Sequence, residues 1–205
     1  MPTIVPETLP SVQRYRLLIS AVVPRPIAWV RTLDANGRGN LAPFSAFAIV
    51  TANPLMVSVT ISHRDPPKDT LANLRATGEA VVHLVPGDCL DVMHQSSCEY
   101  PHDVDEATLL NLALLPSQRV KPERLQAATV ALECVLDREI LVGDPPSSLC
   151  LLRVMLAHID PRIAGPDGLP DPVLHRAVSR LGGEYYLLSE PWPTRPIPRP
   201  RKPTP

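Results

Sequence analysis

The sequence predicts a mainly β protein, a closed antiparallel barrel with short helices inserted between its strands. Apolar runs rich in β-branched residues recur along the chain, and the clearest of them, Leu55–Ser62, contains no proline. Residues 129–141 alternate apolar and polar side chains, and residues 149–159 are apolar enough for burial on both faces. Several such strands with short helices between them favour a barrel over a sandwich.

Taken in order, the chain begins with a polar arm, residues 1–13, and a short helical stretch, residues 14–21. The expected strands are residues 27–33, 40–50, 55–62, 79–85, 129–141 and 149–159. The expected helices are Asp69–Thr77, which Gly78 ends, and residues 87–96 and 171–179, while residues 106–112 are expected to form a turn or a helix. Asn36-Gly37 supplies a hairpin turn between the first two strands, and Pro43 is a point at which the second strand can kink.

Composition bounds the class of protein. With 205 residues, 44% of them hydrophobic and 20% charged, the chain is typical of globular proteins with one sizeable core. A net charge of −1 gives no reason to expect a nucleic-acid or membrane partner. No apolar run reaches the roughly 18 residues of a spanning helix. Residues 1–11 lack the basic and apolar parts of a secretory signal, so the cytoplasm is the expected location.

Proline is unusually frequent, with 26 residues, and the segment 191–205 holds seven of them together with four basic residues. Such a composition cannot build a core, so we expect an extended tail. We therefore divide the chain into the arm, residues 1–13, one domain over residues 14–190, and the tail, residues 191–205. The domain is expected to fold without residues 193–205.

The cysteines and histidines give little indication of disulfide or metal chemistry. Cys134 and Cys150 lie in apolar strand patterns and are expected in the core, and no Cys-x-x-Cys pair is present. The six histidines have no metal-ligand spacing, so no metal is expected. His83 and His158 fall within strands and are expected to be structural.

The most informative stretch runs from Asn40 to Thr70. Residues 40–45 place small residues and a hydroxyl beside backbone that a proline holds extended, and such a segment can offer N–H groups to a flat polar ring. Arg64, Lys68 and Thr70 stand at the start of a helix, where unpaired N–H groups favour an anion. A flat heterocycle at one end and a phosphate at the other outline FMN.

Each half of this pattern also has a plainer explanation. Taken alone, residues 40–45 favour an ordinary turn into a strand. Arg64 and Lys68 alone fit a solvated basic turn as well as they fit a phosphate site, and the helix start beside them favours the phosphate. Asp69 would repel a phosphate, so we expect it to be the helix N-cap or a partner of Arg64 or Lys68.

These residues resemble the flavin reductase-like family, of the flavoredoxin and flavin reductase type, whose fold is the FMN-binding split β-barrel, a Greek-key antiparallel barrel. The resemblance spans residues 14–186. Its motifs are residues 24–28 before a strand, the 40–45 block, Lys68-Asp69-Thr70-Leu71 with Asn73, Gly78-Glu79, Asp105-Glu106, residues 130–134, and residues 180–183 with Tyr185-Tyr186. Each motif is weak alone, but their order and spacing are specific. Ala46 departs from the family, which usually has an aromatic residue beside Ser45.

The resemblance implies a set of cofactor contacts, in which residues 40–45 line the isoalloxazine ring. The full expected set is Asn40, Leu41, Ala42, Pro43, Phe44, Ser45, Ser62, Arg64, Lys68, Asp69, Thr70, Ser96, Arg180 and Tyr185. His63 and His94 would stand at the rim of the flavin as candidate catalytic proton donors. Ser97 would accompany Ser96, and His102 lies in a loop that could cover the site.

The activity that the resemblance implies is hydride transfer from NADH or NADPH to flavin N5. Two alternatives stay open: tightly bound FMN that acts directly on a small organic substrate, and a flavoredoxin-like electron carrier without NAD(P)H activity. The resemblance also implies a homodimer with two flavin sites near its interface. A partner oxygenase that receives the reduced flavin is left open.

Overall fold

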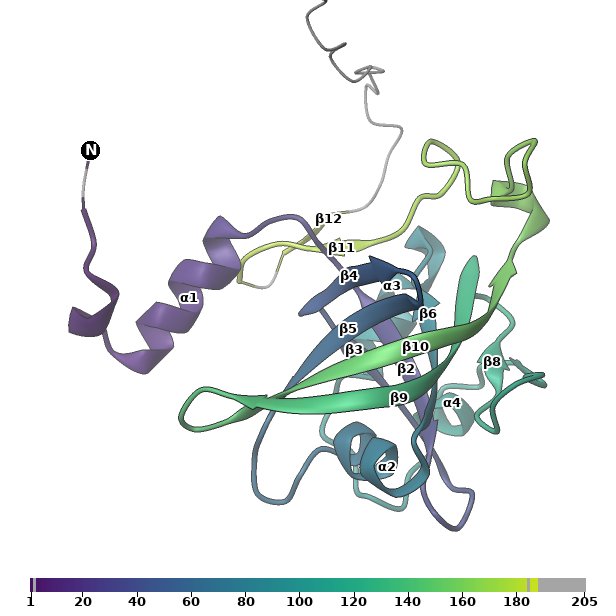
Figure 1. The fold of residues 1–205 in the computed structure, drawn as a ribbon, viewed down its shortest axis with the longest axis horizontal. Coiled ribbons are helices and arrows are strands. Elements are labelled where there is room, and N and C mark those ends of the chain that lie inside the picture. Colours follow the sequence, from purple (N-terminus) through teal and green to yellow (C-terminus); the bar gives the residue numbers. More distant parts are fainter. Residues whose placement is uncertain (2, 184, 188–205) are drawn as a thin grey trace, which may run out of the picture.

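The computed structural model describes residues 1, 3–183 and 185–187. Its centre is a seven-stranded antiparallel sheet in the order β3-β2-β6-β9-β10-β5-β4 (Figure 1). The strands are β2 (Ala28–Leu33), β3 (Gly39–Phe44), β4 (Phe47–Ala52), β5 (Leu55–Ser62), β6 (Glu79–Leu84), β9 (Val130–Val142) and β10 (Ser147–Ile159). The mainly β, antiparallel architecture predicted from the sequence is confirmed.

The sheet curls into a split barrel, and a short link joins its two edge strands. β3 pairs with β2 and β4 pairs with β5 at the opposite edge, although only Ser45 and Ala46 separate β3 from β4 in sequence. The Thr60 N–H donates to the Ala46 carbonyl at 2.8 Å, which ties the link to β5. The single strand predicted over residues 40–50 is therefore wrong. The break falls at Ser45 rather than at Pro43, because Pro43 lies in an edge strand that tolerates its missing N–H.

Apolar side chains fill two main regions, one inside the barrel and one outside the wall formed by β2 and β3, and a smaller cluster forms around Val81. Alternate residues of β2 point to opposite regions, with Val30 in the interior and Trp29 in the outer cluster. Cys134 and Cys150 belong to the interior as predicted, and both are free thiols. Burial raises the pKa of Cys134 to about 12, so this thiol stays protonated and serves as core packing.

The remaining elements are short. The helices are η1 (Pro6–Thr8), α1 (Ser11–Ala21), α2 (Asp69–Thr77), η2 (Gly87–Cys89), α3 (Leu90–Gln95), α4 (Glu106–Leu109) and η3 (Pro161–Ile163). The short strands are β1 (Arg25–Pro26), β7 (Leu114–Leu115), β8 (Arg124–Leu125), β11 (Ser179–Arg180) and β12 (Tyr186–Leu187). No helix in the described part of the chain is both long and apolar enough to cross a membrane.

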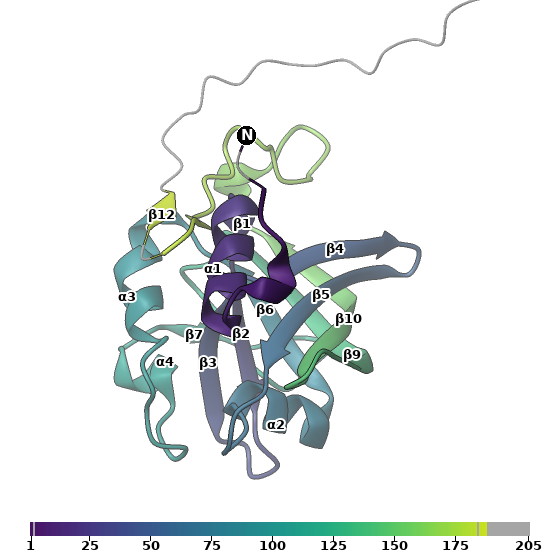
Figure 2. The same cartoon turned by 90° about the vertical axis from the view of Figure 1, so that its left-hand side faces the viewer.

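α2 has the bounds predicted from the sequence, and Gly78 follows it in the left-handed region with φ of 71°. The helix covers one end of the barrel in both views (Figure 1 and Figure 2). Its Leu71 and Leu74 enter the interior core. This packing fixes the start of α2 next to the edge strand β3.

α1 reaches away from the barrel (Figure 1), and none of its residues is buried. It begins at Ser11, three residues before the helical stretch predicted from residue 14, because the Pro10 carbonyl already accepts the N–H groups of Gln13 and Arg14. Tyr15 and Leu18 keep exposed fractions of 65% and 63%. The tail predicted over residues 191–205 lies outside the described residues.

The helix predicted over residues 171–179 is wrong. The Asp171 carboxylate accepts the N–H groups of Val173 and Leu174 at 2.7 and 3.2 Å, which closes a turn. The chain then extends, and the Val178 N–H donates to the Val85 carbonyl at 2.8 Å. These long-range bonds satisfy backbone groups that a helix would have paired internally. The consequence is the short β1-β11-β12 sheet, which positions Arg180.

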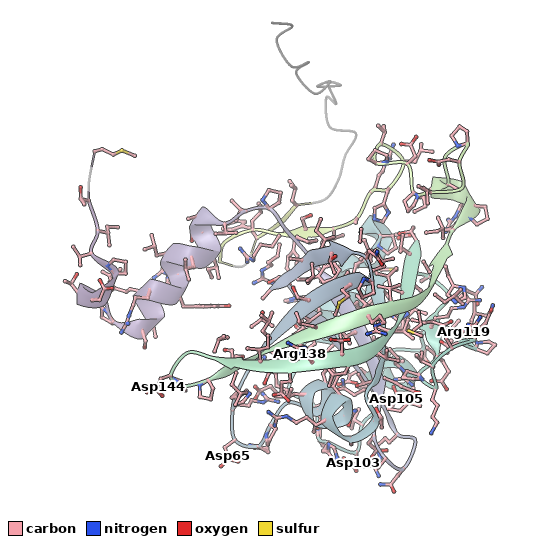
Figure 3. All side chains as sticks on the ribbon, viewed as in Figure 1. Asp65, Asp103, Asp105, Arg119, Arg138 and Asp144 are labelled. Atoms are coloured by element: carbon pink, nitrogen blue, oxygen red, sulfur yellow. The ribbon has the colours of Figure 1, made fainter. Side chains whose placement is uncertain are left out.

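β10 has one buried face, whereas the sequence predicted burial on both. Ser148, Cys150 and Leu152 are buried, while Arg153 and Met155 are exposed. The long β9–β10 hairpin projects beyond the barrel, with Asp144 at its tip (Figure 3). Only the part of β10 that lines the barrel therefore buries its inward-facing side chains.

His83 is buried and structural, as predicted. Its Nδ1 lies 2.9 Å from the Trp29 carbonyl, and its Nε2 accepts the Leu125 N–H at 2.9 Å. These two bonds together require the neutral ring with its proton on Nδ1. Burial is the main cause that lowers the pKa of His83 to about 4.

We expect this histidine to lower the free energy of unfolding by about 2 kcal/mol between pH 7 and pH 5. In the unfolded chain the ring titrates near its ordinary pKa of 6.5, so below that pH the unfolded state binds a proton that the native state refuses until about pH 4. Urea unfolding of the wild type and His83→Gln from pH 5 to 8 measures the effect. The variant should lose this part of the pH dependence, and equal slopes in the two proteins would refute the assignment.

Candidate functional site

A hollow of about 630 Å³ lies between β3, the start of α2 and the loop that follows α3. We call it the first hollow. Its lining residues are Asn40, Ala42, Pro43, Phe44, Arg64, Lys68, Asp69, Thr70, Ser96, Ser97, Cys98, Glu99, Tyr100 and Glu106. Four separate parts of the sequence thus meet here, since Glu106 of α4 also lines the hollow, and most of the cofactor contacts expected from the resemblance are among the lining residues.

One end of the first hollow is cationic. Lys68 is the N-cap residue of α2, and no side chain caps the helix there, so the first N–H groups of α2 lack intrahelical partners. Burial lowers the pKa of Lys68, the nearby Arg64 charge lowers it further, and Glu99 opposes both. The ammonium lies 5.6 Å from the centre of the Phe44 ring. This end combines two cations with a helix start, which suits an anion.

Asp69 does not have the role predicted for it. Helix α2 starts at this residue, so Lys68 and not Asp69 is the N-cap. Its carboxylate accepts from His102 Nδ1 at 2.5 Å, and Arg64 pairs instead with Glu99. The Asp69 carboxylate is therefore held by the loop that follows α3.

β3 forms the wall of the first hollow, and side chains from other elements fix its position. Asn40 Nδ2 donates to Thr70 Oγ1 at 2.8 Å, which links β3 to α2. Leu41 is fully buried in the outer cluster, so it presents only its backbone. Pro43 and Phe44 continue the wall toward Ser45. The predicted block is therefore a rigid strip along one side of the hollow.

Glu106 is a lining residue to which the sequence assigned no site role, although the Asp105-Glu106 pair was part of the resemblance. Its side chain is buried, and its Oε2 accepts the Leu41 N–H at 2.8 Å. Burial raises the pKa of Glu106, the Leu41 bond opposes this, and the Asp105 and Asp69 charges add to the increase. The available signal was an acidic pair at a helix start after an irregular loop.

Arg31 and Asp105 hold this arrangement from behind. Arg31 has an exposed fraction of 2%, and its two terminal nitrogens donate to the Asp105 carboxylate at 2.5 and 2.8 Å (Asp105 is labelled in Figure 3). Asp105 also caps α4 by accepting the Ala107 N–H at 3.0 Å. Burial is the largest single influence and raises the pKa of Asp105, but the bond and charge of Arg31, together with the backbone N–H groups of Ala107 and Thr108, lower the pKa overall. The pair fixes α4, and α4 carries Glu106 to β3.

A second hollow, of about 340 Å³, adjoins the first through Pro43, Phe44 and Ser97. Its lining residues are Ile27, Pro43, Phe44, Ser45, Met93, Ser97, Arg180 and Tyr186. Arg180 lies with its guanidinium carbon 4.4 Å from the centre of the Tyr186 ring. Met93 and Tyr186 had not been singled out as site residues, because only the pairing of β11 and β12 brings Tyr186 here.

Ser96 is buried beside the site and its hydroxyl is engaged by the protein. It accepts from Trp29 Nε1 at 2.9 Å and donates to the Met93 carbonyl at 2.7 Å. Ser97 donates its hydroxyl to the His94 carbonyl at 2.5 Å. These bonds hold the loop that follows α3 against the barrel, and Ser96 shapes the first hollow from behind.

Several residues of the predicted set lie outside both linings. Ser62 and Tyr185 are exposed and contribute to neither hollow. His63 Nε2 lies 2.6 Å from Ser148 Oγ on β10, and His94 Nδ1 lies 3.0 Å from Tyr186 Oη at the margin of the second hollow. Of the two candidate proton donors, only His94 therefore touches a lining residue.

His158 pairs with the buried Glu133 at 2.6 Å and is structural, as predicted. The same carboxylate accepts the N–H groups of Gln118 and Arg119, so it anchors the loop before β8. Within the described ranges, no group of three or more metal-ligating side chains comes together.

The family follows from comparison with known proteins. Residues 20–177 match the model of the flavin reductase like domain. An uncharacterised protein from Halalkalibacterium halodurans is 33% identical over 187 residues, which cover 88% of this chain and 89% of that protein. The chain belongs to the flavin reductase-like family.

Three solved structures share the fold. Nitrilotriacetate monooxygenase component B from Bacillus cereus has a TM-score of 0.88 and 30% identity, with 93% of this chain and 96% of that one covered. The 2-nitrobenzoate 2-nitroreductase NbaA from Pseudomonas fluorescens has a TM-score of 0.87 and 26% identity, with coverage of 97% and 96%. A split barrel domain protein from Shewanella frigidimarina has a TM-score of 0.81 and 19% identity, with coverage of 94% and 96%. The split-barrel fold predicted from the resemblance is confirmed.

Proposed function

We propose that this protein binds FMN along β3 and catalyses its reduction by NADH or NADPH. The observation that carries the proposal is the first hollow, in which a cationic helix start and the edge strand β3 lie side by side. Lys68 is half-buried there and its charged form is disfavoured by burial. A phosphate dianion at this end would compensate that cost, so the residues present fit the cofactor.

In this proposal the chain's residues bind and orient the cofactor. Arg64, Lys68, Thr70 and the first N–H groups of α2 hold the phosphate, and the strip from Ala42 to Ser45 lines the ring. When bound, FMN supplies a two-electron acceptor for a hydride. Because hydride transfer needs no proton from the protein, the contribution of the fold is position and electrostatics.

Anaerobic mixing with each nicotinamide tests the activity. The purified protein loaded with FMN should be yellow, and its flavin absorbance should fall after anaerobic mixing with NADH or NADPH. Saturation of the steady-state rate in added free FMN would identify the flavin as a diffusing substrate. A flavin that stays oxidised with both nucleotides would exclude the reductase activity and leave the flavoredoxin-like electron carrier.

The second hollow favours one further candidate, direct action of bound FMN on a small organic substrate. This hollow adjoins the strip that would line the ring, so a molecule seated there would lie next to the reactive face. The likeness to a 2-nitrobenzoate 2-nitroreductase is consistent with such a use. Turnover that depends on an organic acceptor and does not saturate in free FMN would select this candidate.

We also propose a cytoplasmic homodimer. Val12, Tyr15 and Leu18 are exposed apolar side chains on α1, a helix without a buried residue. A second copy would cover them and bring further residues to each flavin site. The likeness to a monooxygenase component B supports an oxygenase as a receiver of reduced flavin. Light scattering after size exclusion measures the oligomeric state, and a monomer would refute the dimer.

Lys68→Ala is expected to weaken FMN binding about tenfold or more, because it removes one charge-assisted bond to the phosphate. The free energy of unfolding of the flavin-free protein should change little, since Lys68 forms no ion pair within the described residues. Lys121→Ala, an exposed lysine away from both hollows, is the matched control. Fluorescence titration with FMN measures both variants, and wild-type affinity in Lys68→Ala would return this lysine to a structural role.

A further inference from the structure

The second hollow has the chemistry of a substrate site for an anion. Part of its wall is apolar, formed by Ile27, Phe44, Met93 and the ring of Tyr186, and Ser45 and Ser97 add hydroxyl groups. Arg180 is the one cationic residue among its lining residues. Within the described residues no carboxylate pairs with this guanidinium, so its charge is not neutralised there by an ion pair.

Arg180 is held in place before any ligand arrives. Its Nη2 donates to the Gly183 carbonyl at 2.6 Å, and its Nη1 donates to Tyr186 Oη. The guanidinium carbon also lies 4.4 Å from the centre of the Tyr186 ring. Two of its five N–H groups are used in these bonds, and the pairing of β11 with β12 fixes the backbone on both sides. An arginine fixed in this way loses little entropy when it binds a carboxylate.

We propose that the second hollow binds a single-ring planar carboxylate, with the carboxylate on Arg180 and the ring beside a flavin that lies on the Pro43–Phe44 wall. The inference rests on the proposed function, because the same wall would line the flavin ring. The geometry of the guanidinium matches a carboxylate through two parallel hydrogen bonds. At about 340 Å³ against about 630 Å³, the second hollow is the smaller of the two, which suits one ring rather than a dinucleotide.

Benzoate and benzamide are the probe pair, since they share a ring and differ in charge. Each is titrated into the FMN-saturated protein, and the change in flavin absorbance gives the dissociation constant. We expect benzoate to bind at least tenfold more tightly than benzamide. Arg180→Gln should reduce this ratio to near one by weakening benzoate alone. Arg176→Gln is the matched control, since Arg176 is exposed in the same segment and lines neither hollow.

Two results would overturn the inference: equal binding of benzoate and benzamide by the wild type, or a benzoate preference that persists in Arg180→Gln. The second result would be expected if Arg180 contacted only the flavin. A protein that takes up no FMN would instead refute the proposed function. In that case both probes are titrated calorimetrically into the flavin-free wild type and Arg180→Gln. The ratio of the benzamide and benzoate dissociation constants then tests the Arg180 subsite on its own.

Discussion

FMN is expected to bind about 1,000-fold more tightly than riboflavin, because the two ligands differ only in the phosphate. In the proposed site that phosphate meets Arg64, Lys68 and the start of α2. Each charge-assisted bond contributes roughly 1.5–3 kcal/mol. Because Arg64 is 40% exposed, we expect its bond to contribute no more than the lower value of this range. A total of about 4 kcal/mol corresponds to about three orders of magnitude in the dissociation constant.

Titration of the flavin-free protein with both ligands, followed by flavin fluorescence, measures this ratio. The double variant Arg64→Gln/Lys68→Ala should bring the two dissociation constants at least 100-fold closer while affinity for riboflavin changes little. The ratio should also fall with added salt, because part of the attraction is between exposed charges. Equal affinities of the wild type for FMN and riboflavin would remove the phosphate from the first hollow.

Gly39→Ala is expected to destabilise the protein by about 3 kcal/mol, although alanine is the smallest possible side chain to add. A Cβ at Gly39 would lie 2.2 Å from both terminal nitrogens of Arg31. The guanidinium is buried between β3 and α4 and would have to leave Asp105. Separation of a buried pair costs about 3–5 kcal/mol. Because Asp105 is 21% exposed, we expect a cost of about 3 kcal/mol, at the lower end of this range. The corresponding fall in Tm is about 6–12 °C.

A double-mutant cycle isolates this collision. Arg31→Ala alone should cost a similar amount, and Gly39→Ala added to Arg31→Ala should cost less than about 0.5 kcal/mol, because the space is then open. Gly87→Ala is the control for the substitution itself, since nothing lies within 4 Å of its added Cβ. Urea unfolding measures the four proteins of the cycle and the Gly87→Ala control. Additive losses from the two substitutions would show that Arg31 does not pack over Gly39.

The sequence allowed the local elements of the site to be predicted where each is specified by its own residues. Helix α2 was predicted to the residue, since an apolar pattern and Gly78 define its ends. The strip from Asn40 to Phe44 and the cations Arg64 and Lys68 were expected at one site, and the structure brings them to one hollow. These features depend on interactions within a short stretch of chain.

The parts that could not be predicted depend on contacts between distant residues. Nothing near Asp171 indicates that its segment will take its hydrogen bonds from Val85 and β1 rather than from a helix. The partner of Asp69 is equally remote, because His102 reaches it only through the fold of the loop after α3. Glu106 was part of the resemblance, yet its bond to Leu41 joins residues 65 positions apart.

The strand order also governs when this chain can become folded. The sheet has one half made of β3, β2 and β6 and another made of β5 and β4, and β9 and β10 are the strands that pair the two halves. Both halves precede these strands in sequence, so β5 and β6 have open edges until residues 130–159 have been synthesised. The closing contacts are long-range, as Val57 opposite Leu152 illustrates, and such pairing is slow. Until the β9–β10 hairpin docks, two apolar strand edges remain accessible to other chains, so aggregation during synthesis competes with barrel closure.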